Sequence, residues 1–114
     1  MGTDPLIDRI DELERNSREL EIQLRRLRRA TAEIRRARAA GHPVAEILRA
    51  GPGVPARRSV REAWLGVNQA LHAYRVTVVE LLVDVEGLSI ADSARLMGNA
   101  RQVISRLYHG SADR

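Results

Sequence analysis

The sequence predicts an all-α protein with two long helices, a short helix between them and two short helices at the C-terminal end. Three observations lead to this prediction. Apolar residues recur at steps of three and four along two long stretches, as on one face of a helix. Glycines and prolines are concentrated between these stretches, where they break regular structure. The core residues are nearly all Leu, Ile, Val and Ala, with only one Trp, two Tyr and no Phe, which is typical of helical bundles and coiled coils.

The first long stretch carries a heptad pattern for about four repeats, enough to predict a coiled-coil helix. Asp4 can cap this helix with Pro5 at its first position, and Gly41 followed by Pro43 ends it. We therefore predict a helix over residues 5–39 and a coiled-coil segment over residues 1–40. The core positions are Leu6, Ile10, Leu13, Ser17, Leu20, Leu24, Leu27, Thr31 and Ile34.

The heptad stripe has more than one possible partner. Acidic residues dominate the start of this helix and arginines dominate residues 25–38. Antiparallel copies would bring Glu14 near Arg35 and Glu21 near Arg28, and such pairs select orientation although each is weak. We therefore favour an antiparallel homodimer, while pairing of residues 60–86 with their copy, or folding of the first helix onto residues 60–86 of the same chain, are alternatives. The expected dimerisation residues are Leu13, Leu20, Leu24, Leu27 and Ile34.

Residues 41–58 are predicted to be a linker that contains a short helix. Pro43 can open this helix, the stretch Gly51-Pro52-Gly53 can close it, and Val44, Ile47 and Leu48 give it an apolar face. The GPGVP stretch is a break that we expect no helix to cross.

Residues 59–114 are predicted to form the C-terminal domain. Ser59 and Glu62 have the spacing of a capping box, so a second long helix is expected over about residues 60–86, ended by Gly87. Ser89 and Asp92 have the same spacing, at the start of a helix over residues 90–97. Gly98 can end that helix in a left-handed conformation.

The next helix is expected to start directly after Gly98. Asn99 can cap it, with Gln102 three residues on in the reciprocal position. Two short helices joined by so tight a turn, after a long helix that supplies a third wall, have the organisation of a helix-turn-helix.

The stretch GLSIADSARLMGNARQVISRLY, residues 87–108, resembles the helix-turn-helix of sigma factor region four and of many small bacterial regulators. The family pattern has a small residue in the first helix, Gly at the turn and inward-facing apolar residues in the second helix. The matching positions are Ala94, Gly98, Ile104 and Leu107, with Leu96 and Met97 at the apolar end of the first helix. Three positions depart from the pattern: Ser93 and Asn99 replace apolar residues, and Ala100 replaces the usual Ser or Thr cap. The resemblance implies binding of double-stranded DNA, with a recognition helix over about residues 100–109 in the major groove.

Polar side chains of the second short helix face away from Ile104 and Leu107. In this motif the first residues of the recognition helix lie nearest the bases. Arg can bind guanine through two hydrogen bonds and Gln can do the same with adenine, so Arg101 and Gln102 are the expected base readers, followed by Ser105. Arg106 and His109 lie further along and are expected to hold phosphates or to read bases, while Ser89 and Arg95 are expected on the phosphate backbone.

The composition excludes several classes of site. All 19 basic residues are Arg, which fits a GC-rich bacterial genome and also suits contacts to phosphate and base edges. There is no Cys, and His42, His72 and His109 have no ligand-like spacing, so neither a disulfide nor a metal site is expected. No run approaches the roughly 18 apolar residues of a membrane span, and the start lacks the apolar region of a signal peptide.

These features together predict a cytoplasmic, nucleoid-associated, sequence-specific DNA-binding transcriptional regulator that acts as a homodimer. No acid, base and nucleophile converge, so we expect neither an enzyme nor a cofactor. Regulation, if any, would come from a protein partner. Two alternatives stay open: a coiled-coil adaptor that binds RNA polymerase, a sigma factor or a toxin, and an architectural protein that coats DNA through Arg–phosphate contacts.

Overall fold

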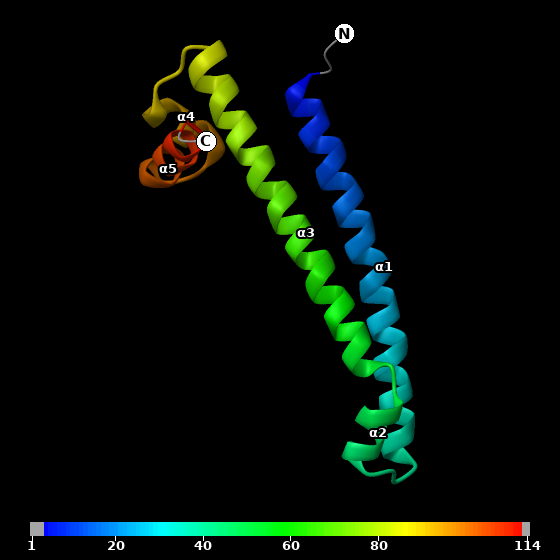
Figure 1. Cartoon of the computed structure of the whole chain (residues 1–114). Helices are drawn as coiled ribbons and strands as arrows, with labels where there is room; N and C mark the ends of the chain where they lie inside the picture. Colours follow the sequence, from blue (N-terminus) through cyan, green and yellow to red (C-terminus); the bar gives the residue numbers. More distant parts are fainter. Residues whose placement is uncertain (1–3, 113–114) are drawn as a thin grey trace. The chain divides into compact units, whose positions relative to one another are not determined.

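The computed structural model describes residues 4–112, and this part of the chain forms helices without any strand. The all-α prediction is confirmed. The elements are α1 (Pro5–Ala39), α2 (Val44–Ala50), α3 (Gly53–Glu80), a π-helical segment η1 (Leu81–Val85), α4 (Ile90–Met97) and α5 (Arg101–Ala112) (Figure 1).

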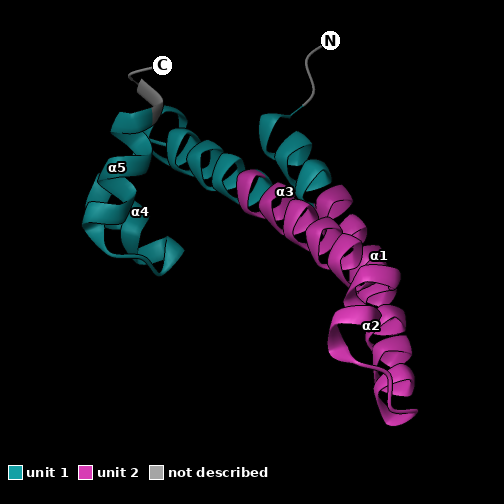
Figure 2. Cartoon of the chain, turned by 60° about the horizontal axis from the view of Figure 1, so that its bottom comes forward, with its two compact units in different colours: residues 1–13, 70–114 teal, residues 14–69 magenta. Residues whose placement is uncertain are grey.

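The chain divides into two compact units (Figure 2). Residues 14–69 form the hairpin unit, and residues 1–13 together with 70–114 form the C-terminal unit. Each long helix contributes to both units. The units therefore cut across the predicted segments 1–40, 41–58 and 59–114.

Helix α1 has the predicted bounds because the sequence carries strong signals at both ends. The Asp4 carboxylate accepts hydrogen bonds from the backbone N–H groups of Leu6 at 2.8 Å and Ile7 at 3.2 Å, which satisfies donors that have no partner inside the helix. Gly41 ends the helix with a φ of +90°. The Arg38 guanidinium then donates to the carbonyl of His42 at 3.2 Å and fixes the turn.

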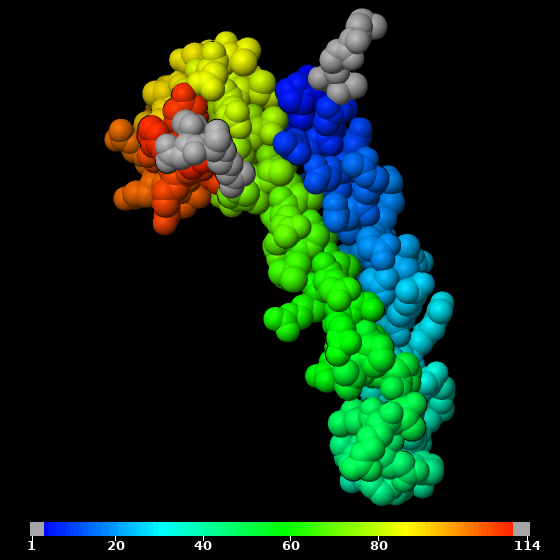
Figure 3. All heavy atoms as spheres, in the orientation of Figure 1, coloured from blue at the N-terminus to red at the C-terminus, as the bar shows by residue number. Residues whose placement is uncertain are grey.

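In the hairpin unit, α1 and α3 run side by side in opposite directions (Figures 1 and 2), and side chains fill the space between them (Figure 3). Two glycines of α3 lie against side chains of α1, which would have to move if either glycine were replaced. A Cβ on Gly66 would lie 2.6 Å from the amide oxygen of Asn16, and one on Gly53 would lie 2.8 Å from Cδ1 of Ile34. The chain therefore adopts the fold-back of α1 onto the second long helix that the sequence left as an alternative.

The buried line on α1 is displaced from the predicted heptad positions. The five expected dimerisation residues are half-buried, whereas the buried side chains are Gln23 and Ala30, each one residue before a predicted core position. An α-helix has 3.6 residues per turn and drifts against a repeat of 3.5, so the contact line moves along the helix. Thr31, predicted in the core, is exposed, and its hydroxyl donates to the carbonyl of Arg28 at 2.9 Å.

The predicted start of the second long helix is wrong. Helix α3 begins at Gly53, inside the GPGVP stretch, and continues through Ser59, so only Gly51 and Pro52 of that stretch form the break between α2 and α3. Pro55 lies in its first turn, where a missing N–H costs no intrahelical hydrogen bond, and the N–H of Ala56 donates to the carbonyl of Pro52 at 3.0 Å. Ser59 and Glu62 therefore lie inside the helix and form no capping box at its start.

The end of this helix also differs from the prediction. The α-helix stops at Glu80 and widens into η1, in which the N–H of Glu86 donates to the carbonyl of Leu81 five residues earlier at 2.9 Å. Gly87 ends the segment with a φ of +75°.

The core of the C-terminal unit joins α3, α4 and α5. Its buried apolar residues are Val79, Ala94, Ile104 and Leu107, and α4 contacts both α5 and η1. The inward orientation predicted for Ile104 and Leu107 is therefore confirmed, and Ala94, predicted as the small residue of the first helix, is buried with them. Ser93 is also fully buried, and its hydroxyl donates to the carbonyl of Ser89 at 2.9 Å, so the polar group that departs from the apolar pattern is satisfied.

The turn between α4 and α5 has the predicted geometry at Gly98 but not at Asn99. Gly98 is left-handed, with φ 67° and ψ 30°, and the N–H of Asn99 donates to the carbonyl of Ala94 at 3.0 Å. Helix α5 begins at Arg101. Ala100 therefore stands at the position before it, and the predicted capping box of Asn99 and Gln102 is wrong by one residue. Leu96, expected at an apolar helix end, is 70% exposed.

Two glycine substitutions with the same added methyl group should have opposite effects. Gly98→Ala should lower the free energy of unfolding by about 1–2 kcal/mol, because Ala is strained in the left-handed region. Gly110→Ala should raise it by about 0.5–1 kcal/mol, because Gly110 lies within α5. Neither added methyl group would meet an atom within 4 Å, so backbone conformation alone decides the sign. Urea unfolding measures both values, and a Gly98→Ala variant as stable as Gly110→Ala would contradict the left-handed turn.

Candidate nucleic-acid interface

The outer face of α5 carries the polar side chains that the sequence predicted to bind DNA. Arg101, Gln102, Arg106 and His109 are exposed and Ser105 is half-buried, while Ile104 and Leu107 of the same helix are buried. A shallow hollow of about 860 Å³ lies over the first turns of this helix. It is lined by Ala100, Arg101, Gln102, Val103, Ser105 and Arg106. The structure thus brings four of the seven predicted residues to one surface, with His109 one turn further along α5.

The charged side chains on the outer face of α5 are all positive. Residues 93–112 contain three arginines and no Asp or Glu. Within the face, the Arg106 guanidinium donates to the backbone carbonyl of Gln102 at 3.4 Å. The positive charge of α5 therefore meets no carboxylate on its own helix and is available to an anionic ligand such as a phosphate group.

The two remaining predicted residues belong to α4 and its cap. The Ser89 hydroxyl accepts from the N–H of Asp92 at 3.0 Å, which confirms Ser89 as the cap. The Asp92 carboxylate does not complete a capping box but forms an ion pair with Arg95. Arg95 is exposed but already shares its charge with an acid, so a phosphate would compete with Asp92 for it.

One interaction that supports the interface was missed from the sequence. The Tyr108 hydroxyl donates to the Asp84 carboxylate at 2.7 Å and links α5 to η1. The Tyr108 ring also packs edge-on against His109, with centroids 5.4 Å apart. The two linked residues are 24 positions apart, and their contact depends on the π-helical segment, which has no spacing signal in the sequence. This bond fixes the end of α5 opposite to the predicted base readers.

The hydrogen bond to Asp84 raises the pKa of Tyr108, and desolvation adds to the effect. A phenol whose pKa is raised on folding contributes stability in full below its unfolded pKa of about 10, and this contribution is lost as the pH rises through the folded pKa. In a ¹³C NMR titration of the tyrosine rings, we expect Tyr108 to ionise above pH 10. Asp84→Ala should lower its pKa, whereas the control Glu86→Ala should leave it unchanged. An unchanged Tyr108 pKa in Asp84→Ala would contradict the hydrogen bond.

Neither the geometry of the described residues nor comparison with known proteins points to another kind of site. Within residues 4–112, no group of three or more His, Asp or Glu side chains is placed to hold a metal ion. None of the helices in this part of the chain combines the length and apolarity needed to cross a bilayer. The chain matches no protein-family model, no curated protein and no solved structure, so its function has to be inferred from its own residues and geometry.

Proposed function

We propose that this chain is a sequence-specific DNA-binding transcriptional regulator of the bacterial cytoplasm, with α5 as its recognition helix. The observation that carries the proposal is the pair α4 and α5, joined at the left-handed Gly98 and packed on the end of α3, with an acid-free polar face turned outward. This is the arrangement by which a helix-turn-helix inserts its second helix in the major groove.

The position of each side chain along α5 suggests its role. Arg101 and Gln102 are the first two residues of the helix, and in a docked recognition helix this end lies nearest the base edges. Arg101 would bind the O6 and N7 atoms of guanine, and Gln102 would bind adenine. Arg106 and His109, one and two turns further along, would hold phosphates. The helix N-terminus adds a partial positive charge toward the DNA.

A second copy of the chain is part of this proposal, because a single unit of this size gains specificity by binding two half-sites. The α1 stripe is half-buried within the hairpin unit, so pairing through other side chains is required. Trp64 is 54% exposed and Leu65 is 52% exposed on α3. Exposed aromatic and aliphatic side chains of this kind are enriched where proteins associate. We therefore assign the dimer contact to the surface around Trp64.

A second candidate function rests on the arginines of α1. All seven arginines between positions 25 and 38 are exposed, and none forms an ion pair with a carboxylate among residues 4–112. Unpaired arginines in a row can clamp phosphates without reading bases. This observation favours an architectural DNA-coating role, in which α1 supplies affinity for any duplex.

The two candidates differ in which arginines carry discrimination between DNA sequences. Arg101→Ala or Gln102→Ala should reduce the preference for a footprinted site over a scrambled duplex by about 1–3 kcal/mol, because a base contact is lost. Arg28→Ala with Arg29→Ala is the matched control on α1 and should leave that preference unchanged. Fluorescence anisotropy over a salt series measures both effects.

Two outcomes would decide against the regulator. One is equal affinity of the unaltered protein for the two duplexes. The other is a loss of affinity in the α1 variant for both duplexes together, with the salt slope flatter by about one unit per lost contact, while Arg101→Ala and Gln102→Ala change nothing. The second outcome would support the architectural role.

The Trp64 surface makes the dimer testable separately from DNA. Sedimentation equilibrium should detect a concentration-dependent dimer. Trp64→Ala should raise its dissociation constant by about 30-fold, the equivalent of a 2 kcal/mol contact. Val85→Ala is the control, because Val85 is 73% exposed but lies in the C-terminal unit, and it should change the constant less than about twofold. A chain that stays monomeric at tens of micromolar would contradict the dimer.

A further inference from the structure

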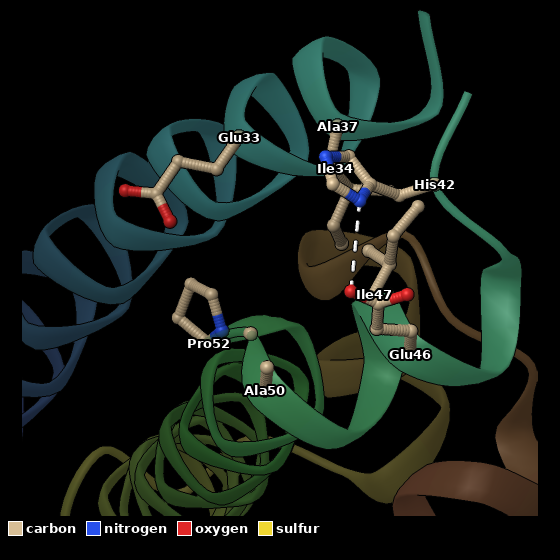
Figure 4. Close-up of a pocket in the computed structure, with 9 residues that line it drawn as sticks. Glu33, Ile34, Ala37, His42, Glu46, Ile47, Ala50 and Pro52 are labelled. Atoms are coloured by element: carbon tan, nitrogen blue, oxygen red, sulfur yellow. Dashed lines mark ion pairs between the residues drawn. The ribbon is translucent and has the colours of Figure 1, made fainter. Parts of the chain in front are cut away.

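The hairpin unit contains a cavity that the proposed DNA-binding function does not use. It lies where the end of α1, the following turn and α2 come together, and its volume is about 250 Å³ (Figure 4). It is lined by Glu33, Ile34, Ala37, His42, Glu46, Ile47, Ala50, Gly51 and Pro52.

The walls of this cavity are held by backbone constraints at both of its edges. At one edge, the Arg38 guanidinium binds the carbonyl of His42 and fixes the turn after α1. At the other edge, α2 closes with the N–H of Gly51 bound to the carbonyl of Ile47 at 2.9 Å. A Cβ on Gly51 would lie 2.7 Å from that same carbonyl oxygen, so the close approach requires glycine. The cavity is therefore a property of a fixed turn and a fixed helix end.

Most of the lining is apolar. Ile47 is buried, Ile34 and Ala37 are half-buried, and Ala50 and Pro52 complete the wall. Ile47 is the only buried residue of α2, since Val44 and Leu48 are 54% and 45% exposed. Ile47, the residue by which α2 joins the interior, is thus also a wall of the cavity. The cavity can therefore accept an apolar group.

The polar lining is acidic, in contrast to the basic chain around it. Figure 4 shows the Glu33 side chain on one side of the hollow and the pair of His42 and Glu46 on the other. The Nδ1 atom of His42 lies 3.6 Å from the Glu46 carboxylate. The Glu33 carboxylate has no hydrogen bond or ion pair to any residue among 4–112, although arginines lie nearby in sequence. No arginine among residues 4–112 lines the cavity.

We propose that this cavity binds a small amphipathic cation, with an ammonium or amidinium group beside Glu33 and an apolar body about one ring in size against Ile34, Ala37 and Ile47. A cavity of about 150 Å³ accepts benzene, and drug-sized ligands need about 300 Å³ or more, so the volume fits a single ring with a short charged arm. The cation donates hydrogen bonds to the Glu33 carboxylate, and the Glu33 and Glu46 carboxylates both repel anions. The site shares no residue with α5 and does not depend on the proposed DNA binding.

A charge series of one ring compound tests this site. The probes are 2-phenylethylammonium, neutral 2-phenylethanol and anionic phenylacetate, each titrated into the full chain at constant ionic strength. NMR should show saturable shifts of the Ala37, Ile47 and Ala50 signals with the ammonium compound. The alcohol should bind at least about fivefold more weakly, since it lacks the charge that pairs with a surface carboxylate, and phenylacetate should not bind.

Matched variants separate the site from the general charge of the chain. Glu33→Gln should raise the dissociation constant of 2-phenylethylammonium about fivefold. Glu21→Gln makes the same charge change at an exposed position of the same helix outside the cavity and should change the constant less than twofold. Ala50→Leu should fill the cavity and abolish binding, while circular dichroism melts confirm that the variant is folded.

Three outcomes would overturn the proposal. The alcohol could bind as tightly as the ammonium compound, which would leave only an apolar hole. Glu33→Gln and Glu21→Gln could weaken binding equally, which would mean attraction by net charge alone. Sedimentation of the same samples gives the third outcome: if 2-phenylethylammonium dissociates a dimer, the natural occupant is an arginine of a second copy and not a small molecule.

Discussion

Burial of Val79 and Ile104 against α4 is the contact on which the C-terminal unit depends. Both side chains have no exposed surface, and the residues of α4 in the same interior are Ser93 and Ala94. Small side chains at these positions let three helices approach closely, and the Ser93 hydroxyl is satisfied by its own helix, so its burial leaves no unpaired donor. Because Ile104 must point inward, the helical period turns Arg101, Gln102 and Arg106 outward. The polar face of α5 is thus a consequence of core packing as much as of its own sequence.

The hairpin unit has fewer fully buried apolar side chains than the C-terminal unit. Its α1 stripe consists of half-buried leucines around the buried Gln23 and Ala30. The Gln23 amide donates to Glu19 at 2.7 Å, while its buried oxygen has no hydrogen-bond partner among residues 4–112, which costs free energy. Large apolar side chains such as Trp64 stay outside. A two-helix pair buries only one side of each helix, so this unit keeps apolar surface that an additional partner would cover. This is the physical reason to expect association of the hairpin unit, whatever contact the association uses.

Local signals in the sequence predicted the structure well, and signals that depend on tertiary packing did not. The caps at Asp4 and Ser89 and the left-handed Gly98 follow from backbone hydrogen bonding within a few residues, so the bounds of α1 and α4 were predictable. The outward face of α5 was also predictable, since it needs only the helical period. The start of α3 was not, because a proline in a first turn and a proline in a break look the same in sequence. The hydrogen bond between Tyr108 and Asp84 joins two elements that are far apart in the sequence, and the cavity beside α2 also depends on how separate elements pack. No residue spacing in the sequence indicates that these elements come into contact.

The positions of the charged residues in this chain say more about its ligands than its net charge does. A GC-rich genome would explain why every basic residue is Arg, but it would not explain why residues 93–112 lack any acid while the cavity lacks any Arg. Randomly scattered charges would weaken ligand binding at both places: an acid on α5 would neutralise its arginines, and an arginine at the cavity would pair with Glu33. The two regions share no residue and lie in different units. Selection for an anionic ligand at α5 and for a cationic ligand at the cavity can therefore act on separate residues, and a charge change at Glu33 alters neither the core contact of Ile104 nor the polar face that this contact orients.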